Sequence, residues 1–97
     1  MTTVTVNASS KSKRATAIRL IKTALEREQD ILRAGLEKTL AALATFEKKY
    51  NMTSQKFFEA YQNGNTDDRN DYVDWAGEYQ IYLSIKEQME AIEDMNI

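Results

Sequence analysis

The sequence contains no cysteine, no histidine and no proline, and it has only three glycines. Without cysteine there is no disulfide framework, no thiolate nucleophile and no cysteine-rich zinc site. Without histidine, the commonest general base and the histidine-based triads and metal sites are excluded. Without proline, nothing forces a break inside a long helix. These absences point away from enzyme chemistry and favour a helical binding module.

The rest of the composition is typical of a small folded protein, with 42% hydrophobic and 29% charged residues in a chain of 97. A chain of this length forms one domain with one modest core. A deep active-site cleft is not expected in so small a domain. We therefore predict a protein that is not an enzyme and that carries no cofactor.

Charge is distributed unevenly along the chain. Residues 1–25 carry five basic residues and no acid, whereas residues 26–97 carry a net charge of −7. The basic residues at the start are Lys11, Lys13, Arg14, Arg19 and Lys22. A basic arm of this kind can contact nucleic-acid phosphates weakly and in a salt-dependent way, but without base specificity. The alternative is that these charges only keep a flexible start in solution.

The first residues differ from the rest of the chain. Residues 2–7 alternate β-branched side chains, which indicates a short strand that is either a frayed tail or paired with another chain. The same stretch lacks the apolar centre of a signal peptide, and no run approaches the roughly 18 apolar residues of a membrane span. We predict a cytoplasmic protein with an extended arm over residues 1–12 and one helical domain over residues 13–97.

Residues 13–50 predict a single long helix interrupted only by Gly35. Its apolar positions recur every three, four or seven residues, at Ile18, Ile21, Leu25, Leu32, Leu36, Leu40, Leu43, Phe46 and Tyr50. Such a helix of 38 residues is about 57 Å long. Asn51 suits the left-handed position after the helix, and the preceding Lys48 and Lys49 suit its negative end.

Two further helices follow. Thr53 or Ser54 is a natural N-cap for a short helix that runs through Gln62. Asp67 or Asp68 is a natural N-cap for a last helix over roughly residues 68–95. The apolar face of this last helix is Tyr72, Trp75, Ala76, Tyr79, Tyr82, Leu83, Ile85, Met89 and Ile92. The predicted fold is all-α: a long antiparallel, coiled-coil-like helical hairpin with a short helix at the bend and a short N-terminal extended arm.

The acidic turn between the last two helices resembles a calcium loop in its spacing. Residues 63–74 place oxygen-bearing side chains at positions 1, 3, 5, 9 and 12 of a twelve-residue window. However, Asp68 replaces the glycine needed at position 6, and Asp74 is too short for the bidentate glutamate at position 12. Helix capping explains these acids, so we predict no metal site. Asp71 and Asp74 share a helix face but have no nucleophile beside them, which favours no catalytic residues.

Aromatic side chains concentrate near the predicted bend, where seven of the nine in the chain fall within 26 residues. These are Phe57, Phe58, Tyr61, Tyr72, Trp75, Tyr79 and Tyr82. They are expected to form the core at the bend. Because tryptophan and tyrosine are also favoured anchors at protein interfaces, we predict that this set includes residues that dock a partner.

Residues 46–83 resemble a family of small antitoxin-like proteins that are paired with RelE-related (TumE-type) toxins. The motif appears here as Tyr50-Asn51-Met52-Thr53-Ser54, Phe57-Phe58, Gly64, Asp67-Asp68, Asp74-Trp75-Ala76 and Tyr79. Asn51 stands where the family usually has glycine. The resemblance implies a protein that binds and neutralises a small toxin ribonuclease, with the basic arm adding operator binding.

Two other roles remain open at the level of sequence. The main alternative is a self-assembling structural coiled-coil protein, because a helix of this length suggests pairing into a homo-oligomer. A ribbon-helix-helix DNA-binding protein would use Thr3, Thr5 and Asn7 in the major groove. That fold needs a turn between two short helices, which residues 13–50 do not offer outside Gly35.

Overall fold

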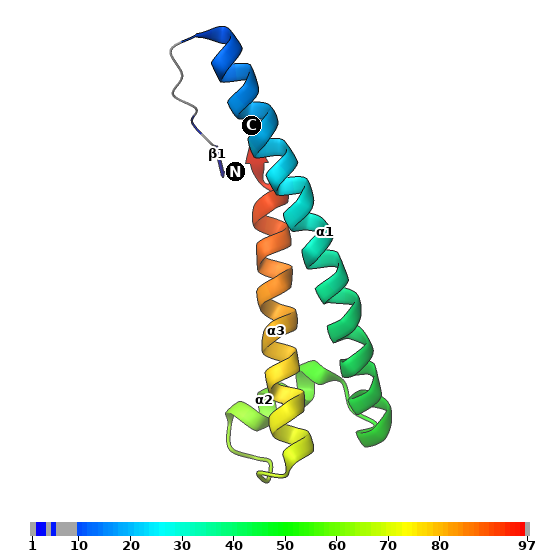
Figure 1. Cartoon of the computed structure of the whole chain (residues 1–97). Helices are drawn as coiled ribbons and strands as arrows, with labels where there is room; N and C mark the ends of the chain where they lie inside the picture. Colours follow the sequence, from blue (N-terminus) through cyan, green and yellow to red (C-terminus); the bar gives the residue numbers. More distant parts are fainter. Residues whose placement is uncertain (1, 4, 6–9, 97) are drawn as a thin grey trace.

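The computed structural model describes residues 2–3, 5 and 10–96. Their elements in chain order are β1 (Thr2–Thr3), α1 (Lys11–Tyr50), α2 (Ser54–Gln62), α3 (Asn70–Glu93) and β2 (Met95–Asn96). Figure 1 shows α1 and α3 side by side and antiparallel, with α2 at the bend. The molecule measures 60 × 23 × 17 Å. The predicted all-α hairpin with a short helix at its bend is confirmed.

Helix α1 is longer at its start than the sequence pattern predicts. Ser10 is its N-cap, and the Ser10 hydroxyl oxygen accepts a hydrogen bond from the Lys13 amide at 3.2 Å. Because of this cap, Lys11 and Ser12 are helical rather than part of an extended arm. At the other end, Asn51 adopts the predicted left-handed conformation, with φ 51° and ψ 50°.

Helix α2 begins at the predicted cap, Thr53, whose hydroxyl accepts from the Lys56 amide at 3.3 Å. The amide of Ser54 donates to a Glu47 carboxylate oxygen at 2.7 Å. A side chain from the last turns of α1 thus satisfies one of the free amides at the start of α2. This contact holds the sharp turn between the two helices. After α2, Gly64 takes a φ of 72°, which is costly for residues with a side chain.

The predicted start and end of the last helix are wrong. Helix α3 begins at Asn70, and its N-cap Arg69 makes no side-chain cap. Asp67 does not cap the helix because its carboxylate accepts from the Arg69 amide and guanidinium instead. The helix ends at Glu93, since Met95 and Asn96 leave it to form β2.

The extended start of the chain pairs within the chain itself. β1 runs parallel to β2, with Thr2 opposite Met95 and Thr3 opposite Asn96. The prediction that this segment is either a frayed tail or paired with another chain is therefore wrong for Thr2 and Thr3. Thr5, also predicted to belong to this strand, is not in a strand, and the other predicted residues Val4, Val6 and Asn7 lie outside the described residues.

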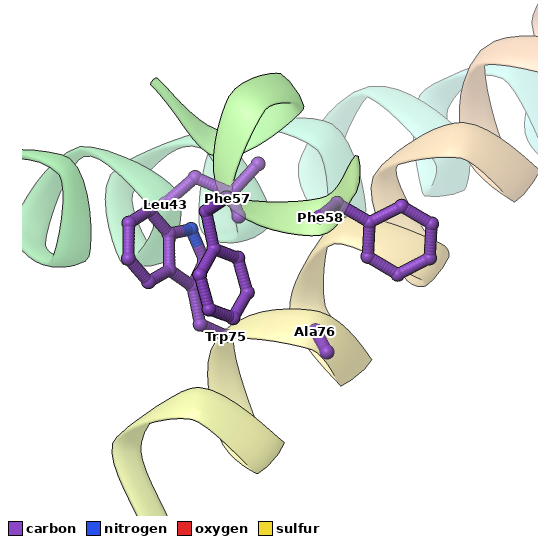
Figure 2. Close-up of a cluster of buried hydrophobic side chains, with 5 residues drawn as sticks. All are labelled: Leu43, Phe57, Phe58, Trp75 and Ala76. Atoms are coloured by element: carbon purple, nitrogen blue, oxygen red, sulfur yellow. The ribbon is translucent and has the colours of Figure 1, made fainter. Parts of the chain in front are cut away.

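The core lies at the bend end of the hairpin. Its buried cluster, drawn in Figure 2, comprises Leu43, Phe57, Phe58, Trp75 and Ala76. Further along the two long helices, Leu32 and Ile85 are also buried. The hydroxyl of Thr39, 1% exposed, donates to the Glu78 carbonyl at 3.1 Å across the α1–α3 contact.

Most residues of the two predicted apolar faces point inward. Leu40 and Leu83 are exceptions, with 46% and 42% of their surface exposed. A hairpin of two helices has flanks that no third helix covers, so the edges of each apolar stripe remain in contact with solvent. Within the part of the chain that the structure describes, we find no helix with the length and apolar character needed to cross a membrane.

Two glycines inside the long helices differ in their surroundings. A Cβ at Gly77 would meet no side chain within 4 Å, whereas one at Gly35 would stand 3.2 Å from the Ile85 Cδ1. Glycine inside a helix costs about 0.5–1 kcal/mol relative to alanine. We expect Gly77→Ala to raise the free energy of unfolding by about that amount and Gly35→Ala to raise it by less. Urea unfolding followed by circular dichroism measures both, and equal gains would contradict the close contact at Gly35.

Candidate functional site

The bend is organised around the indole ring of Trp75, which is fully buried. Phe57 from α2 stacks on it with ring centroids 3.9 Å apart and planes within 2°, as Figure 2 shows. Phe46 and Tyr50 from α1 each stack on the indole at 5.7 Å. Trp75 itself belongs to α3, so this one ring joins all three helices.

The ring nitrogen of Trp75 also has a hydrogen-bond partner. The Trp75 Nε1–H donates to the Ser54 hydroxyl at 2.9 Å, and both residues are buried. From the sequence, Ser54 is expected only as a candidate N-cap of the short helix. A small hydroxyl residue at a helix start is so common that no sequence signal distinguishes this buried role. The hydrogen bond sets the orientation of the indole in its plane, because only one ring atom can donate.

The seven aromatic residues predicted to dock a partner fall into two groups. Phe57, Phe58 and Trp75 are 1%, 8% and 0% exposed, so in this structure they form the core and offer no surface to a partner. For these three residues the predicted contact role is corrected. The partly exposed group comprises Tyr61, Tyr72, Tyr79 and Tyr82, which pack against the core from its edges.

A carboxylate ties the end of α1 to the start of α3. Oδ2 of Asp71 accepts from the Lys49 ammonium and from the Tyr50 hydroxyl, each at 2.6 Å. The hydrogen bond from Lys49 and then that from Tyr50 lower the pKa of Asp71 below its usual 3.8. The same carboxylate raises the pKa of Lys49. Asp71 lies in the first turn of α3, and both of its partners come from the end of α1, so the residues next to it in the sequence do not indicate this bridge.

A second ion pair lies in the loop before α3. The guanidinium of Arg69 contacts both oxygens of Asp67, at 2.8 and 2.6 Å, and lowers the pKa of Asp67 to about 2. The guanidinium carbon also lies 4.5 Å from the centre of the Tyr72 ring, a cation–π distance. The loop is therefore fastened to the aromatic edge of the bend by a single arginine.

These contacts border a cleft of about 310 Å³ at the tip of the hairpin. It is lined by Tyr50, Met52, Phe57, Ala60, Asn65, Thr66, Asp67, Tyr72 and Trp75. Met52, one of these residues, is 44% exposed. The lining combines aromatic side chains with the polar residues Asn65, Thr66 and Asp67, which suits an apolar side chain with hydrogen-bonding groups beside it. Over the residues that the structure describes, no three acidic side chains gather closely enough to hold a metal ion.

The predicted nucleic-acid contacts lie far from this cleft. Lys11, Lys13, Arg14, Arg19 and Lys22 are all exposed along the first turns of α1. Figure 1 places this blue end of α1 at the opposite end of the molecule from the bend. Arg19 and Lys22 border a shallow hollow together with Ile18. The structure therefore separates the aromatic and the basic residues into two distant surfaces.

Comparisons with protein-family models, with curated proteins and with solved structures return no match to this chain.

The buried hydrogen bond between Ser54 and Trp75 gives a direct test of this core. Ser54→Ala leaves the indole N–H without a partner, which costs about 1–3 kcal/mol of unfolding free energy. The matched control is Ser84→Ala, since Ser84 is exposed and bonds only Gln88 on its own helix. Trp75 is the only tryptophan, so its fluorescence reports unfolding of both variants. Equal stability of the two variants would show that the hydrogen bond contributes nothing.

The Asp71 bridge predicts a pH dependence. A carboxylate whose pKa is lowered by folding stabilises the folded state above its usual pKa of 3.8, and this contribution is lost as the pH falls through the lowered value. We therefore expect Asp71→Asn to be less stable than the wild type at neutral pH and nearly as stable at low pH. Asp30→Asn is the control, because Asp30 pairs only with Arg33 on the exposed side of α1. A constant difference at every pH in denaturant titrations would contradict the bridge.

Proposed function

We propose that this protein is a non-catalytic helical module that docks a second protein at the aromatic bend. The observation that carries the proposal is the cleft at the tip of the hairpin, with the exposed Met52 and the ring of Tyr72 among its lining residues. An apolar, partly open surface of this kind is typical of the sites at which proteins anchor a partner side chain.

The bend is held in place by the core beneath it. The stack of Phe57 on Trp75 and the hydrogen bond to Ser54 link α2 to α3, and the Asp71 bridge links α3 to α1. A surface supported in this way loses little conformational freedom on binding. The arrangement therefore supports binding through a preformed site.

The kind of partner follows from two further considerations. Residues 26–97 carry a net charge of −7, which suits a basic protein such as an RNA-cleaving enzyme. The residues that resemble the antitoxin family include Tyr50, Met52 and Asp67, which also line the cleft. We therefore propose an antitoxin-like role in the cytoplasm, in which the bend covers a small RelE-related toxin ribonuclease.

Co-expression with the product of the neighbouring gene tests this role. We expect the two proteins to copurify and the chain to relieve the toxicity of that product. Met52→Glu places a charge in the lining of the cleft and should weaken binding by at least about tenfold. Ile31→Glu is the matched control, because Ile31 is 65% exposed on α1 away from the bend. Its binding should equal that of the wild type.

Calorimetry or surface plasmon resonance with the purified partner gives the binding constants. Circular dichroism verifies that both variants remain helical. If the neighbouring product neither binds nor loses toxicity, the antitoxin role is wrong. If it binds but both variants bind equally well, the partner uses a surface other than the cleft.

A further inference from the structure

Helix α1 extends well beyond the end of α3. Gly35 faces Ile85, and the two helices run antiparallel, so Glu93, eight residues after Ile85, is level with Arg27, eight residues before Gly35. Residues 11–26 of α1 therefore project past the end of α3, as Figure 1 shows. This projection, called the overhang below, is about 24 Å long.

The overhang is a basic amphipathic helix. Ile18, Ile21 and Leu25 continue the apolar stripe that α1 buries against α3 further along, but the overhang has no α3 beside it. Its first turn contains basic residues and no acid. The start of a helix already carries a partial positive charge, so basic residues there are unfavourable unless an acidic surface lies against them.

A groove of the opposite charge lies between α1 and α3. It has a volume of about 380 Å³ and is lined by Leu36, Leu40, Tyr82, Lys86, Met89, Glu90 and Glu93. Its floor is apolar, and Leu40 is 46% exposed there. The last turn of α3 holds no basic residue, so the partial negative charge of the helix end adds to that of Glu90 and Glu93. We call this feature the acidic groove.

We infer that the overhang of one copy docks in the acidic groove of a second copy, and that the exchange is reciprocal. Ile18 of the overhang covers Met89, while Arg19 and Lys22 approach Glu90 and Glu93. Each copy thereby supplies a third helix to the two-helix part of the other. The dimer thus places basic side chains against the acidic end of α3.

The geometry of α1 allows such a pair to close. Ile18 and Leu25 in the overhang lie on the same face of α1 as Leu36 in the groove, because their spacings follow the helical repeat. A two-fold axis perpendicular to α1 then places each overhang on the opposite groove, so no open surface remains to propagate a filament. The groove runs about 17 Å along α3 from Tyr82 to Glu93, which is shorter than the overhang of about 24 Å, so the overhang is long enough to span the whole groove.

A second copy fits the overhang better than nucleic acid does. A phosphate backbone would pair with the basic side chains but would leave Ile18, Ile21 and Leu25 without an apolar contact. The acidic groove offers both the apolar floor and the opposite charge. Nucleic-acid binding by the overhang is therefore an alternative outcome of the experiment below.

Charge exchange between two variants tests the reciprocal contact. The first variant carries Arg19→Glu and Lys22→Glu, and the second carries Glu90→Lys and Glu93→Lys. For the full chain, sedimentation equilibrium should give twice the mass of 11.2 kDa. Each variant alone places like charges against each other and should dimerise at least about tenfold more weakly. An equimolar mixture of the two should dimerise again, because both contacts then join opposite charges.

Three controls accompany this experiment. Lys38→Glu with Lys56→Glu changes the net charge as much as the first variant does, at exposed residues outside the groove. This variant should remain dimeric. Met89→Glu should weaken the dimer and Ile31→Glu should not, since only Met89 lines the groove. Circular dichroism verifies that every variant is folded.

The possible results of this experiment distinguish the dimer from the alternatives. A monomer at all accessible concentrations overturns the inference, and so does a dimer that is insensitive to both charge variants. Failure of the mixture to dimerise also overturns it, because the contact is then not between overhang and groove. If the first variant instead abolishes binding to a duplex DNA probe while the dimer is unchanged, the overhang is a nucleic-acid surface. Met52→Glu should leave the dimer intact, so this test is independent of the proposed function at the bend.

Discussion

The stack of Phe57 on Trp75 is the contact on which the rest of the structure depends. A two-helix hairpin buries little surface, and only at the bend does a third helix close over it. There the indole meets rings from α1 and α2, and its N–H finds Ser54. Burying a large aromatic ring is among the strongest stabilising contributions that one side chain can make. Because that contribution is concentrated at one end, the opposite end of the hairpin is left with less support.

Because the core is concentrated at the bend, apolar side chains remain uncovered elsewhere on the molecule. Helix α3 has 24 residues and α1 has 40, so the antiparallel pair cannot match along its whole length. Leu40 and Leu83 remain exposed on the flanks, and the overhang carries an apolar stripe with no α3 beside it. In a small chain, apolar surface that the chain cannot cover itself favours association. The bend, in contrast, has a cleft beside the aromatic core.

The charged side chains also differ between the bend and the opposite end of the molecule. Ion pairs at the bend join sequence-distant elements, as Asp71 does with Lys49, and these contribute to the folded structure. The charges at the other end, in the overhang and in the last turn of α3, oppose their own helix dipoles. An oppositely charged surface outside the chain would compensate the basic residues of the overhang and the acidic residues at the end of α3. We propose that these two ends make two different contacts, one with another protein and one with a second copy.

The sequence by itself determined the three helices and some of their ends, including the end of α1 and the start of α2. Helical periodicity, the absence of proline and the caps at Asn51 and Thr53 all act over a few residues, so they can be read from neighbours in the chain. The tertiary structure decided which side chains are buried and which pair. Phe57 and Tyr61 lie on one short helix, yet only the first stacks on Trp75, and Asp67 bonds Arg69 instead of capping α3. Burial and pairing depend on what a residue meets across the hairpin, and that information is spread over residues far apart in the chain.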